Sequence, residues 1–171
     1  MRLRGSLPAT AAQRIRRLSA ALRCLSGNQA VRLQRHIFWE MEEWLDRGLG
    51  PQHLIEPEVA KILSEAIRHR ESTDDWTAVE FVIMPNHLHL FFGSQHDDLP
   101  QVLVRFKQWT GGRAARILAL AGGHFWQSEW FDHWSRSPAE DERILQYMRD
   151  NPVGARLVDH WRNWPYASWA G

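Results

Sequence analysis

Residues 81–92 read FVIMPNHLHLFF, and this stretch contains the pattern that decides the fold. The segment 76–84 is rich in Val, Ile, Thr and aromatic residues, which favour β-strands. Pro85-Asn86 is a turn signal, and residues 87–92 have the composition of a second strand. The stretch therefore predicts two consecutive strands joined by a tight turn or bulge.

The second of these strands carries two histidines, His87 and His89. Alternate residues of a strand point to the same face, so the two imidazoles lie side by side. A purely structural strand would carry apolar residues such as Val or Ile at these positions. Two imidazoles on one face of a rigid strand instead form half of a metal site.

Helical periodicity surrounds this strand pair on both sides. Gly27-Asn28 separates the first two predicted helices, and Pro57 is compatible with the first turn of the third. Asn151-Pro152 is expected to end or kink the last helix, and an aromatic-rich strand is expected at residues 125–135. Helices and strands alternate without clean parallel units, which favours an α+β fold with an antiparallel sheet in one domain, residues 1–171. The helices are predicted at about 9–25, 29–47, from 57 onwards, 99–121 and 138–150.

The composition is that of an ordinary globular protein, with 44% hydrophobic and 24% charged residues in 171. No apolar run approaches the roughly 20 residues that span a bilayer, so no membrane partner is expected. The single cysteine, Cys24, excludes an internal disulfide framework and a cysteine-rich zinc site. A reducing compartment such as the cytoplasm is the simple inference.

Positive charge is concentrated in the first part of the chain and is almost entirely arginine. No acidic residue precedes Glu40, whereas eight arginines do, and Lys61 and Lys107 are the only lysines. The guanidinium fork suits phosphate groups. A GC-rich genome, which favours arginine codons, is an alternative explanation of the same bias. The ten tryptophans are either core residues or stacking platforms for unpaired bases.

The last predicted helix contains a candidate nucleophile, Tyr147. Tyr147 and Asn151 are four residues apart and therefore share a helical face. A tyrosine beside a metal can attack phosphate, and nearby cationic charge would favour its phenolate form. The alternative, a core tyrosine with a satisfied hydroxyl, is equally compatible with the spacing.

Several segments together resemble the single-tyrosine HUH transposases, most closely the REP-associated tyrosine transposase branch. The segment MPNHLHL at 84–90 is similar to the His-hydrophobe-His motif of that family. The match runs in order over roughly residues 30–170. The other similar segments are Phe125-Trp126-Gln127, Phe131-Asp132-His133, Arg136, the block from Tyr147 through Asn151-Pro152 to Val158, and Trp164-Pro165-Tyr166-Ala167-Ser168.

The resemblance implies a ferredoxin-like (RRM-like) antiparallel sheet with helices packed on one face, and a helical insertion at about 9–70. It implies a nuclease and strand transferase that acts on single-stranded or hairpin DNA through a 5′-phosphotyrosine intermediate. Carried over by position, His87 and His89 are ligands of a divalent metal, Mg²⁺ or Mn²⁺, and Tyr147 is the nucleophile. Asn151 falls at the position of the family's third ligand.

The substrate in that branch is typically a palindromic hairpin with a short single-stranded guide. Basic residues on the helix at 99–121 are candidates for phosphate contacts, or else form a solvated helix face. The resemblance is compatible with a monomer or a homodimer. The candidate DNA-binding residues are Arg105, Lys107, Arg113 and Arg116.

One departure concerns the start of the sequence. Family members usually begin with a strand of alternating aromatic and Thr residues that leads into a Ser-Leu-Pro stretch. Here Ser6-Leu7-Pro8 follows almost at once, so the first strand is expected to be largely missing. That strand would lie centrally, beside the histidine strand, and its loss would expose unpaired backbone groups.

Two other functions are compatible with parts of this pattern. A protein that keeps the fold and binds DNA hairpins but has lost cleavage would retain most of the same segments. A nucleotide hydrolase of the histidine-triad type carries His-x-His-x-His, and Phe91 occupies the third of these positions.

Overall fold

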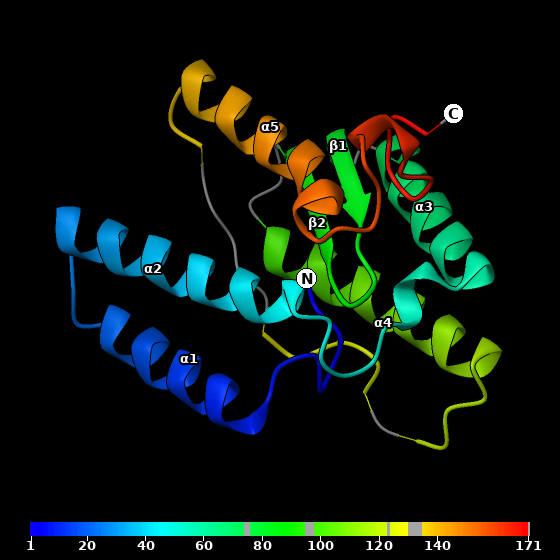
Figure 1. Cartoon of the computed structure of the whole chain (residues 1–171), viewed down its shortest axis with the longest axis horizontal. Coiled ribbons are helices and arrows are strands. Elements are labelled where there is room, and N and C mark those ends of the chain that lie inside the picture. The colour runs from blue at the N-terminus through cyan, green and yellow to red at the C-terminus, as the bar shows by residue number, and fades with distance from the viewer. Residues whose placement is uncertain (74–75, 95–97, 123, 130–134, 171) are drawn as a thin grey trace.

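The computed structural model describes residues 1–73, 76–94, 98–122, 124–129 and 135–170. Within these residues the chain forms five α-helices, two short 3-10 helices and a two-stranded antiparallel sheet, which confirms the α+β class (Figure 1). In chain order the elements are α1 (Ala9–Leu22), α2 (Gly27–Asp46), η1 (His53–Ile55), α3 (Pro57–Ser72), β1 (Thr77–Ile83), β2 (Leu88–Gly93), α4 (Leu99–Ile117), α5 (Pro138–Gly154) and η2 (Trp161–Asn163).

The predicted strand pair is the hairpin of β1 and β2. Val82 lies opposite His89, and Ile83 lies opposite Leu88. The backbone N–H of Met84 donates to the carbonyl of His87 at 2.8 Å and closes the turn. The proline and asparagine of this turn therefore act as the sequence predicts, and they place both histidines at the turn end of the hairpin.

Residues 1–3 lie beside the histidine strand. Arg2 bridges to His87 and Leu3 bridges to Trp126, both in antiparallel orientation. The N–H of Leu3 donates to the carbonyl of Asn86 at 2.9 Å, and the N–H of Leu88 donates to that of Met1 at 2.7 Å. The described N-terminal residues thus occupy the central position that the resemblance assigns to the first strand.

This pairing corrects the expectation that backbone groups beside the histidine strand are left unpaired. Leu3 is 1% exposed, and the backbone next to His87 is hydrogen-bonded rather than open. On the other edge, Val82 bridges to Ala167, and the N–H of Ile83 donates to the carbonyl of Tyr166 at 2.8 Å. The histidine strand is therefore held between paired neighbours, which makes its geometry rigid.

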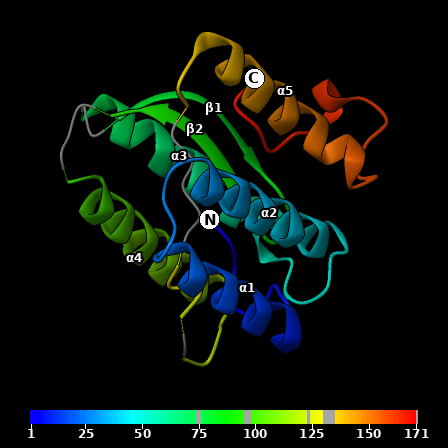
Figure 2. The ribbon, with the colours of Figure 1, turned by 90° about the vertical axis from the view of Figure 1, so that its left-hand side faces the viewer.

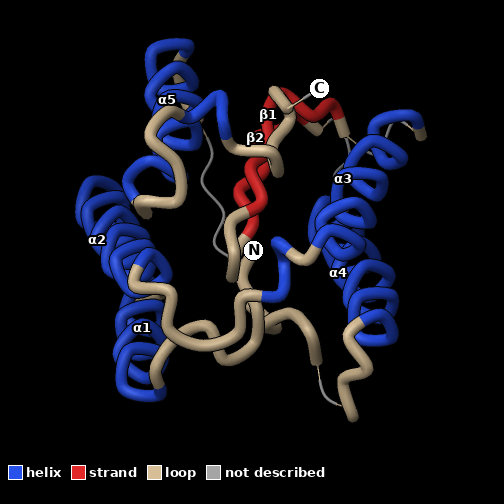
Figure 3. Tube along the Cα trace, turned by 45° about the vertical axis from the view of Figure 1, so that its right-hand side comes forward, coloured by secondary structure: helices blue, strands red, loops and turns tan. Residues whose placement is uncertain are grey.

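Helices cover both faces of the hairpin, not one face as expected. Phe81 and Ile83 point into a core formed with α3 and α4, whereas Val82 and Met84 pack with Met148 of α5. Figure 3 shows α3 and α4 on one side of the strands and α2 and α5 on the other. The reason is that β1 ends in consecutive buried apolar residues, with Phe81 and Ile83 on one face and Val82 on the other, so each face buries its own layer there.

Helices α1 and α2 pack against each other through a separate small core. Its buried members come from the start of the chain, from α1 and from α2, and Figure 2 shows the two helices lying side by side. The buried residues are Leu7, Ile15, Ile37, Met41 and Leu45. The C-terminal half of α2 lies next to the turn of the β-hairpin. There the Asn86 side-chain amide donates to the carbonyl of Leu45 at 2.9 Å.

Three predicted boundaries are wrong in the structure. Helix α1 ends at Leu22 rather than near residue 25, α4 ends at Ile117 rather than near residue 121, and α5 continues past Pro152 to Gly154. Pro152 has no N–H to donate back along the helix, yet the turn continues beyond it, and the N–H of Ala155 donates to the carbonyl of Asn151 at 2.9 Å.

The strand predicted at residues 125–135 is not present where the structure describes this segment. Only Trp126 forms a bridge there, to Leu3. Residues 130–134 of the predicted strand lie outside the described residues. Trp126 is fixed instead by packing on α4, where its indole N–H donates to the Thr110 hydroxyl at 2.9 Å.

The glycine pair in α4 has two different roles. A Cβ added at Gly111 would lie 3.2 Å from Cδ1 of Trp126 and 3.3 Å from Cβ of Phe125, whereas one added at Gly112 would meet nothing within 4 Å. Gly111 therefore allows the segment with Trp126 to approach the helix. Gly112 only lowers the helix propensity.

We expect Gly112→Ala to raise the free energy of unfolding by up to about 1 kcal/mol, because alanine favours a helix over glycine. Gly111→Ala gains the same propensity but crowds Trp126 and Phe125. It should be less stable than Gly112→Ala by about 1–3 kcal/mol. Urea unfolding of the two variants measures this difference, and equal stabilisation by both would contradict the close approach.

Candidate active site

The two histidines present their ring nitrogens to one point. Nε2 of His87 and Nε2 of His89 are 2.9 Å apart. Nδ1 of His87 lies 2.7 Å from Oδ1 of Asn86, to which it donates, so Nε2 carries a lone pair. Burial lowers the pKa of His87 to about 3, which keeps this ring neutral at neutral pH. A neutral imidazole held by an outer hydrogen bond is the form that ligates metals.

A carboxylate from α2, Glu42, completes this group. Its Oε2 lies 3.1 Å from Nε2 of His89 and 3.7 Å from Nε2 of His87. One atom from each of the three residues falls within 4.8 Å of the others, and this is the single such group of His, Cys, Asp and Glu in the described part of the chain. Two imidazoles and one carboxylate form a donor set for a divalent cation.

The charge of Glu42 is fixed by these neighbours. Burial by itself would raise the pKa of Glu42, but His89 and His87, with hydrogen bonds from His89 and Tyr147, lower it to about 2. The side chain is therefore a carboxylate although it is only 3% exposed. Buried charges need partners of this kind.

Glu42 was not predicted as a site residue from the sequence, although the sequence contains a signal for it. Glu42 lies next to Met41 and three residues before Leu45, and both belong to the buried face of α2. An acidic residue on the apolar face of a helix is rarely buried unless it is paired or functional. The sequence offers no indication of its partner, because His89 lies far away along the chain and on another element.

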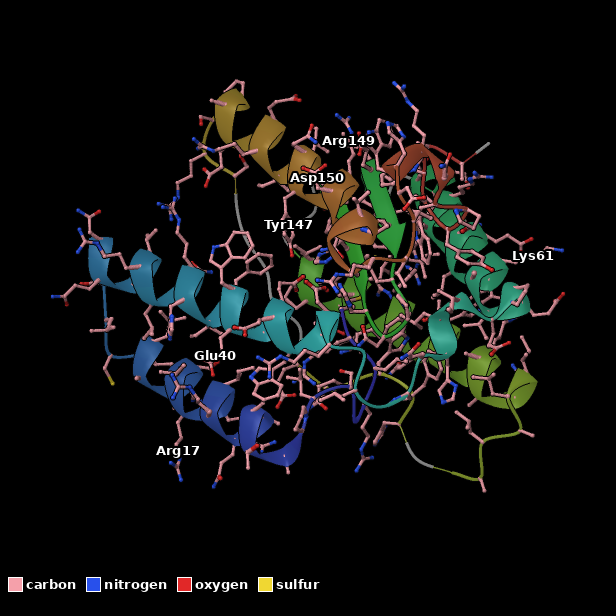
Figure 4. The ribbon with its side chains drawn as sticks, viewed as in Figure 1. Arg17, Glu40, Lys61, Tyr147, Arg149 and Asp150 are labelled. Atoms are coloured by element: carbon pink, nitrogen blue, oxygen red, sulfur yellow. The ribbon has the colours of Figure 1, made fainter. Side chains whose placement is uncertain are left out.

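The side chain of Tyr147, on α5, points towards the group formed by Glu42, His87 and His89. Its hydroxyl donates to Oε2 of Glu42 at 2.5 Å. Figure 4 shows Tyr147 between α5 and α2. Burial raises the pKa of Tyr147, and the charge and hydrogen bond of Glu42 raise it further, so the hydroxyl is protonated at neutral pH. The group next to the phenol is an anion, not the cation that would favour a phenolate.

Asn151 lies one helical turn from Tyr147 and joins the same site. Its Nδ2 donates to the Tyr147 hydroxyl at 3.0 Å and lies 3.4 Å from Nε2 of His89. Its Oδ1 is buried and has no hydrogen-bond partner among the described residues. A buried amide oxygen without a partner is unusual, and a rotated amide would turn this oxygen towards His89.

The position of α5 is fixed by contacts outside the site. Arg149 forms an ion pair with Glu80 of β1, and Met148 is buried against Val82 and Met84. Figure 4 shows Arg149 on the same helix as Tyr147. These contacts hold the helix at the hairpin, so Tyr147 is delivered to the histidines by rigid elements.

The four basic residues proposed for DNA contacts do not join this site. They lie on α4, which is on the opposite side of the hairpin from α5 (Figure 3). Lys107 donates to the carbonyls of Gln127 and Ser128 at 2.5 and 2.7 Å, which fixes a loop. Arg113 lies over the Trp109 ring at 4.4 Å, Nε of Arg116 donates to the Gly112 carbonyl at 3.2 Å, and Arg105 is exposed.

A groove of about 980 Å³ opens onto the site. His89 and Tyr147 form part of its wall, together with Phe38 and Trp39 of α2 and Arg143 of α5. Its volume lies at the upper end of the range for ligand sites. The candidate nucleophile and one candidate metal ligand are therefore accessible from a single hollow. No helix in the described part of the chain is both long and apolar enough to cross a membrane.

A known protein family covers most of the residues that form this site. The model of the family described as "Transposase IS200 like" matches residues 51–151, which is more than half of the chain. This range contains both histidines, Tyr147 and Asn151, whereas Glu42 lies before it. Residues 131–133, which also resemble that family, lie outside the described residues.

Among solved structures, the fold is similar to that in "Structure of the REP associates tyrosine transposase bound to a REP hairpin". The TM-score is 0.59 at 20% sequence identity, over 72% of this chain and 71% of that chain. At this identity the similarity establishes a shared fold. No curated protein matches the sequence significantly.

Proposed function

Because the chain belongs to the IS200-like transposase family, we propose that it cleaves and rejoins single-stranded DNA through a covalent bond to Tyr147. The observation that carries this proposal is the convergence of Tyr147 from α5, Glu42 from α2 and the two histidines of the β-hairpin. The Tyr147 hydroxyl is 2.5 Å from Glu42, which in turn is 3.1 Å from His89. A nucleophile, a proton acceptor and a cation site thus adjoin one groove.

The donor set fits a divalent metal. Two imidazole nitrogens and a carboxylate oxygen face one point, and the amide oxygen of Asn151 is buried nearby without a partner among the described residues. His87, His89 and Glu42 would hold the ion, with Asn151 as a further ligand. Carboxylate and amide oxygens suit Mg²⁺, whereas two imidazoles favour Mn²⁺. A bound ion would polarise the scissile phosphate and stabilise the charge that develops on it.

The residues of the chain account for the proton and the covalent bond. The Tyr147 oxygen attacks the phosphorus while its proton passes to Glu42, the carboxylate that already accepts its hydrogen bond. The bond from phosphorus to the 3′-oxygen breaks, and that oxygen leaves and takes up a proton from water. The 5′-phosphate then remains on Tyr147 until another 3′-hydroxyl displaces it. That hydroxyl loses its proton to water as the new bond to phosphorus forms, and Glu42 returns its proton to the tyrosine oxygen that leaves. No nucleotide cofactor is required, since the phosphotyrosine keeps the bond energy.

We propose hairpin DNA with a single-stranded flank as the substrate. The protein of similar fold is described as bound to a REP hairpin, which supports this choice. Arg105, Arg113 and Arg116 lie on α4, away from the site, where they are candidates for contacts to the phosphates of a duplex stem. Lys107 is better explained as a residue that fixes the loop at 127–128.

The experiment that tests the proposal follows a labelled hairpin oligonucleotide in the presence of Mn²⁺ or Mg²⁺. A 3′-end label should migrate with the protein on a denaturing gel, whereas a 5′-end label should be released. This polarity distinguishes a 5′-phosphotyrosine from a 3′-phosphotyrosine. Binding of hairpins without any adduct would instead favour a DNA-binding protein that does not cleave.

A further inference from the structure

Trp39 of α2 is unusual because a large aromatic side chain is exposed beside a candidate nucleophile. Its side chain is 56% exposed. The ring centroid lies 5.2 Å from that of Tyr147 and 5.3 Å from that of Phe38, both in edge-on geometry. The edge contacts fix the orientation of the indole and leave its surface accessible from the groove that it lines.

The groove next to Trp39 combines apolar and cationic features. Its walls include Phe91 of β2 and Phe38, and guanidinium groups enter the lining from two helices, Arg35 of α2 and Arg143 of α5. Flat aromatic surfaces with flanking arginines are how proteins bind unpaired nucleotides. A base paired in a duplex could not offer its face to a side chain in such a groove.

Two acidic residues also line the groove, and both lie in the first turn of α5. Glu140 is 4.0 Å from Arg35, and its other oxygen accepts the backbone N–H of Arg136. Asp141 lies at the same helix N-terminus, where negative charge is stabilised. These carboxylates are thus engaged locally.

We propose that Trp39 is the stacking platform for the unpaired base next to the phosphate that Tyr147 attacks, with Arg35 and Arg143 holding flanking phosphates. This inference rests on the proposed function and specifies how the substrate strand is held. Trp39 lies outside residues 51–151, so the family match assigns it no role. Helix α2 is then a substrate-binding element as well as the source of Glu42.

The test uses the full chain and a hairpin oligonucleotide with 2-aminopurine placed in turn at each unpaired position. Binding to wild type should quench the fluorescence at the position next to the cleavage site. Trp39→Ala should remove this quenching, weaken binding about tenfold and slow adduct formation. Trp39→Phe keeps an aromatic face and should retain most of the binding.

Leu49→Ala is the control for the loss of an exposed apolar side chain, because Leu49 is 48% exposed and does not line the groove. Equal effects of Trp39→Ala and Leu49→Ala, or wild-type binding and adduct formation by Trp39→Ala, would overturn the inference. If wild type binds the oligonucleotide without forming an adduct, the proposed cleavage fails, yet the quenching and affinity of Trp39→Ala still decide the role of Trp39. Thermal unfolding of each variant reports whether the fold is intact.

Discussion

Tyr147→Phe is expected to abolish the covalent adduct with hairpin DNA, by more than about a thousandfold, while binding of the same oligonucleotide is retained. The substitution removes only the hydroxyl that donates to Glu42, and the ring keeps its edge contacts with Phe38 and Trp39. Adduct is measured on a denaturing gel with a 3′-labelled oligonucleotide, and affinity is measured by fluorescence anisotropy.

The chain contains one other tyrosine, Tyr166, which makes a matched control. Tyr166 lies in the C-terminal segment, where its backbone carbonyl accepts the N–H of Ile83. Tyr166→Phe should therefore form the adduct at nearly the wild-type rate. An adduct that survives in Tyr147→Phe would contradict the assignment of the nucleophile, most directly if Tyr166→Phe were the variant that lost it.

Glu42→Gln is expected to weaken Mn²⁺ binding by at least about tenfold and to slow adduct formation by a larger factor. Glutamine is almost isosteric and still accepts the Tyr147 hydrogen bond, but it lacks the negative charge that faces the two histidines. It also cannot take the tyrosine proton as readily as a carboxylate. Titration calorimetry with Mn²⁺ alone measures the first effect without reference to activity.

The weaker Mn²⁺ binding of Glu42→Gln should also appear as a smaller increase in the free energy of unfolding when Mn²⁺ is added. Mn²⁺ at about 100 times its Kd stabilises the wild type by about 2.7 kcal/mol, and a tenfold weaker site gains about 1.4 kcal/mol at that concentration. Glu43→Gln is the control, because Glu43 is exposed and pairs with Arg47 on the outer side of α2. Equal Mn²⁺ affinity in Glu42→Gln and Glu43→Gln would remove Glu42 from the metal site.

The local features of this protein could be predicted from the sequence because they depend on short-range spacing. The hairpin follows from β-favouring residues around Pro85-Asn86, and the alternation of a strand puts His87 and His89 on one face. Helical periodicity likewise puts Tyr147 and Asn151 on one face of α5, where Nδ2 of Asn151 lies 3.0 Å from the Tyr147 hydroxyl oxygen. Hydrogen bonds within a few residues determine these relations, so no long-range information was required.

Tertiary structure alone decided how these pieces form a site. Glu42 and Tyr147 are 105 residues apart, and their contact exists only because α2 and α5 pack on the same side of the hairpin. The protonated state of Tyr147 and the exposed face of Trp39 depend on the same packing. Periodicity identifies the buried side of a helix but not the partner that covers it. The sequence therefore determined the histidine pair and the shared helical face of Tyr147 and Asn151, and the assembly of the helices decided that the carboxylate beside them is Glu42.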